Sequence, residues 1–225
     1  MKKTFFTILF AFFLFLTGHG LYAQQKFSAG VQGGLGASYA HNYFQGGSEY
    51  TSELELGIPR NYPLFSYMYN LYLSYSITEE FGIALEPGFI RKGFGNKNVT
   101  EESDILFNQR RFDYLQVPLL LELHVSESVV LSAGPEFCYL LSAKMRTTTN
   151  SKSAVLTDLS KDNRFDFGIQ AGGYYRLMKH VDVGLKLGAS ITRTDKYYLT
   201  NDAGEVLTGV SRRNMYANSF IRVRL

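Results

Sequence analysis

The stretch VDVGLKLGASIT, residues 181–192, alternates without a break between apolar and small or polar side chains. The odd-numbered positions hold Val, Val, Leu, Leu, Ala and Ile, whereas the even-numbered ones hold Asp, Gly, Lys, Gly, Ser and Thr. A period of two is the repeat of a β-strand with one apolar face and one polar face. Because the pattern recurs up to the last residue, the chain is predicted to be all-β.

The N-terminus has the layout of a secretory signal peptide. Lys2 and Lys3 precede an apolar run over residues 4–16, and the spacing predicts cleavage after Ala23. The apolar run is shorter than the roughly 20 residues that cross a bilayer as a helix. We therefore expect residues 24–225 to form a single β-barrel domain. Without the two lysines the formal charge falls from +3 to +1, so nothing suggests nucleic acid as a partner.

The mature chain contains eight long alternating segments separated by connections of two kinds. The expected strands cover residues 27–40, 65–77, 81–94, 112–125, 129–142, 164–177, 181–194 and 213–225. Tight turns are expected at 78–80, 126–128 and 178–180, and long polar loops at 41–64, 95–111, 143–163 and 195–212. Short and long connections alternate strictly, as in outer-membrane barrels. The predicted fold is an eight-stranded antiparallel transmembrane β-barrel with short periplasmic turns, long extracellular loops and both termini in the periplasm.

Alternation alone does not say which face of a strand points outward. A soluble lipocalin-type barrel would turn its apolar face inward, but export, strand length and the asymmetry of the connections favour lipid outside. Leu185 should then contact lipid while Lys186 lines the lumen. With this polarity six charged side chains should share the interior as a buried network: Glu86, Glu122, Glu136, Arg176, Lys186 and Arg222.

An eight-stranded barrel has an interior that side chains just fill. Unpaired charges there would cost several kcal/mol each, so we expect these six groups to pair or to hold water. The favoured interpretation is a structural plug, and the alternative is a gate or a narrow ion path. Cys138, the only cysteine, is expected to fill space in the interior rather than to react.

Three prolines, Pro87, Pro118 and Pro135, fall inside predicted strands, where each removes one donor from the hydrogen-bond ladder. A closed barrel has no edge strand to accommodate them, so local bulges or tilted pairing are expected there.

Several segments resemble one known family. YLQVPLLLE at 114–122 resembles the hallmark strand of the PorT-like outer-membrane β-barrels, and EPGF at 86–89 and GPEF at 134–137 are similar to the strands beside it. The early GVQGG at 30–34 and the late GIQAGG at 168–173 are similar to the glycine-rich strands of the family. The resemblance implies an eight-stranded barrel in the outer membrane of Bacteroidetes-type bacteria, with some members connected with protein secretion. It brings no catalytic residue, and for Glu122 it implies a role in interior packing.

No enzymatic signature stands out. His124 and Glu122 lie two apart on one face, but no serine, histidine and carboxylate have a recognisable catalytic spacing, and no cluster has metal-ligand spacing. Catalytic, cofactor-binding and metal-binding residues are therefore expected to be absent. Two arginine pairs at loop ends, Arg110–Arg111 and Arg212–Arg213, could contact anionic headgroups or form solvated loop bases.

The predicted function is a structural or interaction role through the surface loops or the periplasmic face. The alternatives are a component of a secretion system, a small pore, and a lipid-modifying enzyme. Expected partners are outer-membrane lipid and other envelope or secretion proteins, around a monomeric barrel without a cofactor.

Overall fold

The structure is a computed structural model that describes a large part of the chain. The described residues are 26–45, 60–97, 105–149, 155–158, 164–193, 195–200 and 206–225. They form the strands β1 (Phe27–Gln45), β2 (Arg60–Ser76), β3 (Phe81–Leu85), β4 (Gly88–Lys97), β5 (Ile105–His124), β6 (Val129–Thr149), β7 (Val155–Asp158), β8 (Phe165–Met178), β9 (Val181–Ser190), β10 (Asp195–Thr200) and β11 (Val206–Arg224). The described residues include no helix that is long and apolar enough to cross a membrane. The expected signal peptide lies outside them.

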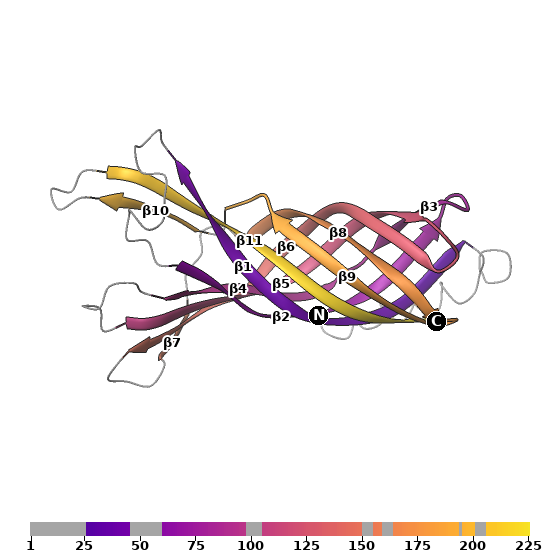
Figure 1. The fold of residues 1–225 in the computed structure, drawn as a ribbon, viewed down its shortest axis with the longest axis horizontal. Coiled ribbons are helices and arrows are strands. Elements are labelled where there is room, and N and C mark those ends of the chain that lie inside the picture. Colours follow the sequence, from indigo (N-terminus) through magenta and orange to yellow (C-terminus); the bar gives the residue numbers. More distant parts are fainter. Residues whose placement is uncertain are drawn as a thin grey trace, which may run out of the picture.

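These strands occupy eight positions of one closed antiparallel sheet (Figure 1). β3 and β4 follow each other along one position, since both pair with β2 and β5. In the same way β7 and β8 both pair with β6, and β9 and β10 both pair with β11. The ring closes where β1 pairs with β11, from Gly30 opposite Arg224 to Gln45 opposite Gly209. The predicted eight-stranded antiparallel barrel is confirmed.

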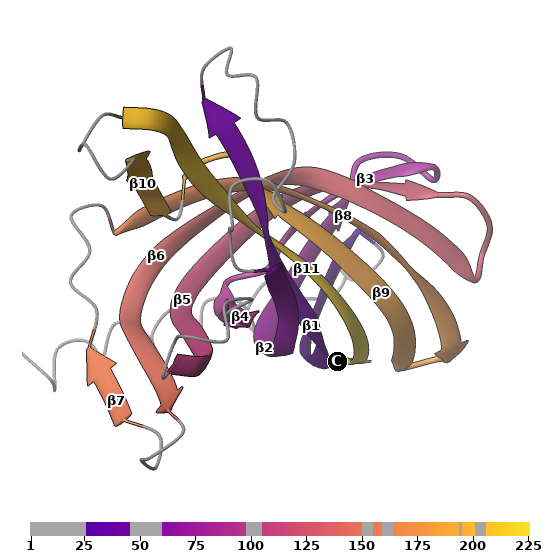
Figure 2. The same cartoon turned by 60° about the vertical axis from the view of Figure 1, so that its left-hand side comes forward.

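The two ends of the barrel differ. At the turn end, short connections at 77–80, 125–128 and 179–180 join neighbouring strands, and the C-terminus lies beside them. At the opposite loop end the strands continue past the ring and diverge (Figures 1 and 2). The long loops were therefore predicted too long. For example, β1 runs on to Gln45 and β2 begins at Arg60, well inside the expected loop 41–64. Pairing persists there although the sequence no longer alternates strictly between apolar and polar residues.

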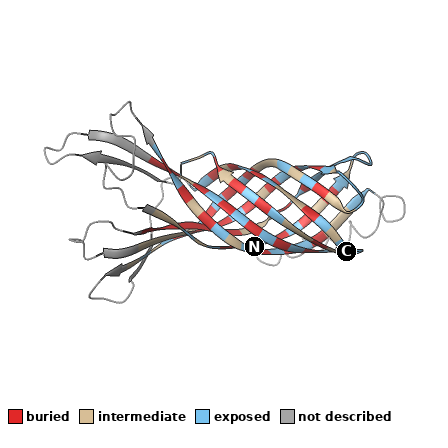
Figure 3. Ribbon diagram, in the orientation of Figure 1, coloured by how far each residue is buried: buried red, intermediate tan, exposed pale blue. Residues whose placement is uncertain are grey.

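Burial alternates along the strands, which gives the wall a chequered appearance (Figure 3). Leu185 is 64% exposed and its neighbour Lys186 only 1%, so the predicted polarity of the seventh segment is correct. Outward-facing leucines in β5 likewise flank the buried Leu120 and Glu122. Apolar side chains thus cover the outside of the ring at the levels of Leu185 and of β5, while Lys186 and Glu122 are enclosed.

The prolines do not produce the expected bulges. Pro87 separates β3 from β4, yet its carbonyl still accepts a hydrogen bond from Leu71 N at 2.9 Å. The carbonyl of Pro118 accepts one from Glu86 N at 3.1 Å. Each of these two prolines removes one donor and keeps its acceptor, and the register shifts that the sheet contains lie at other positions. Pro135 also stays in register, opposite Ile169, so the bulges expected at these three prolines are absent. A register shift does occur in β2, between Pro63 and Tyr67.

A bulge does occur between β5 and β6. Asp113 lies opposite Ser142, whereas Tyr114 lies opposite Leu140, so β6 holds one additional residue at this point. Because side chains alternate along a strand, one extra residue exchanges inward and outward positions beyond it. Before the bulge the even-numbered residues of β6 point inward; after it Lys144 is exposed while Ala143 is buried.

Candidate functional site

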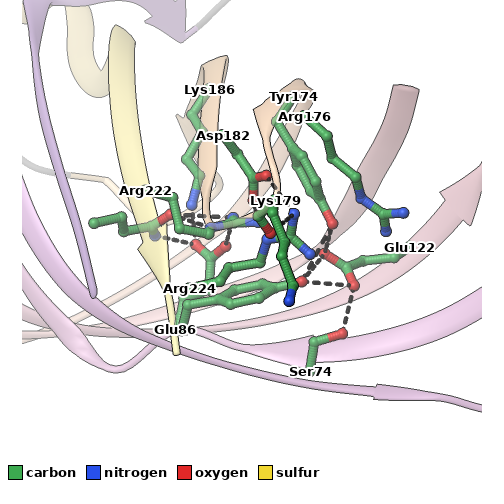
Figure 4. Close-up of polar contacts among 12 residues, drawn as sticks. Ser74, Glu86, Glu122, Tyr174, Arg176, Lys179, Asp182, Lys186, Arg222 and Arg224 are labelled. Atoms are coloured by element: carbon green, nitrogen blue, oxygen red, sulfur yellow. Dashed lines mark hydrogen bonds and ion pairs between the residues drawn. The ribbon is translucent and has the colours of Figure 1, made fainter. Parts of the chain in front are cut away.

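The lumen contains a cluster of ion pairs centred on Glu86, at the end of β3 (Figure 4). Its carboxylate accepts hydrogen bonds from Lys186 Nζ of β9, from Arg222 Nη2 of β11 at 3.0 Å and from Gln32 Nε2 of β1 at 2.8 Å. Glu86 is fully buried and the two cations are 1% exposed. Residues from four positions of the ring thus meet on one carboxylate.

Arg222 links this cluster to the turn end of the lumen. Its guanidinium lies 3.5 Å from the ring centroid of Tyr72 and 4.3 Å from that of Tyr174, which is cation–π geometry. The same group lies 3.7 Å from Asp182, and Arg224 forms a second ion pair with Asp182 at 3.1 Å. Arg222 therefore has carboxylates on both sides and aromatic rings over its face.

Glu122 is held by hydroxyl groups rather than by a cation. It accepts hydrogen bonds from Ser74 Oγ at 2.6 Å, from Tyr72 Oη at 3.0 Å and from Tyr174 Oη at 3.3 Å. The carboxylate is 1% exposed, so these donors replace the water that it would otherwise bind. Because Tyr72 and Tyr174 also cover Arg222, Glu122 joins the Glu86 cluster indirectly.

A second cluster lies nearer the loop end. Lys92 Nζ donates to Glu136 at 2.5 Å and lies 3.5 Å from Asp166. Glu136 also accepts hydrogen bonds from Tyr216 Oη and, at 2.9 Å, from the Cys138 thiol. Lys92 was absent from the predicted network. The sequence did contain a signal for Lys92. It lies an even number of residues from Glu86 within one predicted strand, so both side chains should point to the same, inward face.

Arg176 lies at the turn-end margin of the first cluster, opposite Asp182 in the register of β8 and β9. It is half-buried at the turn end, where its Nη1 donates to the backbone carbonyl of Glu127 at 2.9 Å. Thus Lys186 and Arg222 both contact Glu86, Glu122 adjoins them through tyrosines, and Glu136 pairs with Lys92. The two arginine pairs at the loop end are each split by alternation. Arg212 is buried and donates to Asn42 at 3.0 Å, whereas Arg213 lies against the outer Tyr43 ring. Arg110 lies 5.9 Å from the centroid of the buried Phe94 ring, whereas Arg111 lies on the outer wall.

The clusters are embedded in closely packed side chains. The largest side chains that are less than 2% exposed come from strands all around the ring: Arg222, Tyr72, Tyr114, Lys92, Phe94, Phe112, Lys186, Met68, Ile90, Leu120, Gln116 and Gln170. They extend from the turn end, near Tyr72, to Phe94 and Phe112 beyond the second cluster. The interior of the ring is a packed core with charges inside it.

Below this core the turn end opens into a cavity of about 740 Å³, which we call the vestibule. Its lining includes one carboxylate side chain, that of Glu79, and six basic side chains: Lys26, His124, Arg176, Lys179, His180 and Arg224. Three buried nitrogens in this lining have no hydrogen-bond partner among the described residues: His124 Nε2, Arg176 Nε and Arg224 Nε. The basic side chains outnumber the acidic one, and a lining of this kind suits an anionic group.

The arrangement of nucleophiles does not match a catalytic triad in the described part of the chain. Ser74 donates directly to Glu122, so no histidine stands between hydroxyl and carboxylate as a general base would. Nor do the described residues contain a group of three or more His, Cys, Asp or Glu side chains arranged to hold a metal ion.

The closed wall, the apolar exterior and the charged interior together define a membrane β-barrel. A family model described as "outer membrane protein beta-barrel domain" matches residues 22–196, more than half of the chain. The chain belongs to this outer membrane protein β-barrel family. Its short turns then face the periplasm and its long loops the cell exterior. Among curated proteins, none matches the sequence.

Solved structures with similar architecture include three outer-membrane barrels. Neisserial surface protein A is 13% identical, with a TM-score of 0.44, covering 88% of this chain and 97% of that one. OprG from Pseudomonas aeruginosa is 10% identical, with a TM-score of 0.43, and the match covers 89% of this chain and 97% of that one. The outer membrane protease OmpT from Escherichia coli is 9% identical, with a TM-score of 0.42, and the match covers 93% of this chain and 100% of that one. Similarity at this level carries no argument about function. The assignment depends on the family match and the strand pairing, and the PorT-like branch stays a prediction.

Proposed function

We propose that this outer-membrane barrel has an interaction or structural role and neither conducts solutes nor catalyses a reaction. The observation that carries the proposal is the buried cluster of Glu86, Lys186 and Arg222 in the middle of the lumen. Buried ion pairs of this kind are costly to separate, because each charge left alone has lost its hydration. A solute would have to break them to pass.

Conductance measurements in planar bilayers test whether the lumen is closed. The purified barrel should show no discrete conductance steps, whereas the small-pore alternative expects steps that change when Glu136→Gln or Lys186→Met is introduced. The conductance of each variant is compared with that of the parent protein at equal insertion, and heat-modifiable gel mobility measures how much of each protein is folded. Steps in the parent protein that respond to either substitution would overturn the proposal.

The vestibule is the part of the periplasmic face best suited to an interaction. Its basic lining favours a negatively charged segment of an envelope protein, and it lies between the short turns, where a partner can reach it. A photoreactive residue at Ile77, which lines the vestibule, should crosslink a partner in cells. The same residue at Ile191, on the outer wall, provides the control. A stable complex that co-purifies in detergent would favour the secretion-machinery alternative over a solitary barrel.

The lipid-modifying alternative makes an opposite prediction. It requires His124 and Glu122 to act on a lipid, yet Glu122 is 1% exposed and occupied by three hydroxyl donors. Incubation of the folded barrel with outer-membrane lipids should give no new product by mass spectrometry. A product that disappears in Glu122→Gln and His124→Gln would refute the non-catalytic assignment.

A further inference from the structure

The outer wall of the barrel carries a separate cluster of cations, on β4, β5 and β6 near the loop end. It surrounds a cavity of about 200 Å³ lined by Arg91, Arg111, Asp113, Lys144 and Arg146, which we call the outer cationic hollow. The three strands are neighbours in the sheet. The hollow therefore lies on the continuous outer surface and not in the lumen.

Its height on the wall follows from the outward positions of β5. From Leu123 to Leu115 these positions are all apolar, over a span that matches the roughly 9–11 residues a tilted strand needs to cross the bilayer. The next two outward positions are Asp113 and Arg111. On β3 and β4 the outward residues are likewise apolar up to Phe89 and are followed by Arg91. The hollow thus begins where the hydrocarbon layer ends, on the side of the long loops.

Aromatic rings mark the same boundary. Tyr67 and Phe89 stack with centroids 5.9 Å apart, and Tyr139 and Phe165 meet edge to face at 5.3 Å. Outer-membrane barrels carry such aromatic girdles at the membrane interfaces. The hollow adjoins this girdle, since the guanidinium of Arg91 lies 4.8 Å from the centroid of the Tyr67 ring.

The bulge between β5 and β6 assembles the hollow. In unbroken alternation, the even-numbered Lys144 and Arg146 would point into the lumen with Glu136 and Cys138. The extra residue turns both side chains outward, beside Arg111. Bulges in sheets are known to redirect side chains near functional sites.

The charges in the hollow are unbalanced. Both oxygens of Asp113 are bound by Arg91, at 2.6 and 2.9 Å. Arg111 and Lys144 lie directly opposite each other in the register, an arrangement that destabilises a sheet when both residues are cationic. Asp158 of β7, opposite Lys144 in the ladder, offsets one positive charge, but the four cations of the lining still outnumber the two acidic residues. Arg111 is opposite Gly93, which has no side chain to fill the space beside it. An anion between the cations would relieve their repulsion.

We propose that the outer cationic hollow binds a phosphate group on the headgroup of a lipid in the outer leaflet. Phosphate matches the paired N–H donors of arginine, and lysine adds a point charge. A lipid is favoured over free phosphate because the hollow lies directly above the apolar wall, so an acyl chain can lie along the barrel while its headgroup occupies the hollow. This site is independent of the vestibule and of the closed lumen.

Native mass spectrometry of the mature barrel, released from detergent, tests the proposal with diphosphoryl lipid A as the probe. The parent protein should retain the probe, and Arg111→Ser with Lys144→Ser should weaken retention roughly 25-fold, about fivefold for each cation. Arg164→Ser with Arg193→Ser removes two exposed cations elsewhere at the loop end and should leave retention unchanged. The double replacement Arg111→Lys with Lys144→Arg keeps the charge and should preserve most of the binding.

Three outcomes would overturn the proposal. If the hollow variant and the control variant lost retention of lipid A equally, the binding would reflect nonspecific electrostatic attraction and not this site. Retention of lipid A without phosphates as strong as that of the diphosphoryl form would exclude phosphate recognition. If inorganic phosphate displaced lipid A at a concentration similar to that of the lipid, the acyl chains would contribute nothing to binding. Heat-modifiable mobility in gels identifies any variant that fails to fold, and the single Lys144→Ser then replaces the double variant.

Discussion

Replacing Glu86 by Gln is expected to be among the most damaging conservative changes in this chain. Glu86 is fully buried and accepts hydrogen bonds from Lys186, Arg222 and Gln32. Glutamine keeps the size of the side chain but removes the charge that balances two cations, each 1% exposed. Arg222 retains Asp182 at 3.7 Å. Breaking a buried pair by removing one partner costs about 3–5 kcal/mol, and we expect a loss of unfolding free energy in that range.

The assay is urea unfolding of the mature barrel in lipid vesicles, followed by circular dichroism and by the gel mobility of the folded form. Tryptophan fluorescence is not an option because the chain contains no Trp. Glu80→Gln makes the same chemical change in an exposed turn and should alter stability by less than about 0.5 kcal/mol.

A double-mutant cycle separates charge pairing from simple packing. Adding Lys186→Met to Glu86→Gln removes the cation that has lost its partner, so the double variant should recover at least about 1 kcal/mol. If Glu86→Gln cost no more than Glu80→Gln, or if the two lumen substitutions were strictly additive, the ion-pair account of the plug would be refuted.

Three further predictions concern the wall and the interior. Leu185→Arg places a cation on the outer face and should destabilise the barrel in lipid by about 2–4 kcal/mol if it lies near the midplane; an unchanged urea midpoint in vesicles would argue against lipid contact at that position. Gly36→Val should prevent or slow assembly, because a Cβ at Gly36 would overlap Asn218 and the adjacent backbone of β11, and the fraction of heat-modifiable protein after refolding measures this. Cys138, 4% exposed and hydrogen-bonded to Glu136, should resist alkylation while the barrel is folded and react at once in urea, and mass spectrometry reads the modification directly.

Much of the wall could be predicted from the sequence because the relevant signal is local. Consecutive side chains of a strand point to opposite faces, so the alternation places Leu185 and Lys186 on different sides of the wall. The length of the strands and the asymmetry of their connections then assign the lipid side. The order of short and long connections then predicts an up-and-down ring of eight strands. The strand ends at the loops were less predictable, since pairing continues where burial no longer demands alternation.

Which charged side chains pair inside the lumen could be learned only from the tertiary structure. Glu86 and Lys186 are 100 residues apart, and their contact follows from the stagger of strands around the closed ring, which no local pattern encodes. The same holds for the pairing of Lys92 with Glu136, and for Arg176, whose position along the barrel axis places it at the turn end.

The sequence by itself determined that this chain is an up-and-down barrel whose strands have one apolar and one polar face, because a period of two is a property of each strand alone. Only the tertiary structure decided which charges meet, since that depends on register between distant strands. It also decided which cations lie on the outer wall. A single extra residue in β6 reverses the orientation of Lys144 and Arg146, and nothing in the pattern of their neighbours marks the place where the reversal occurs.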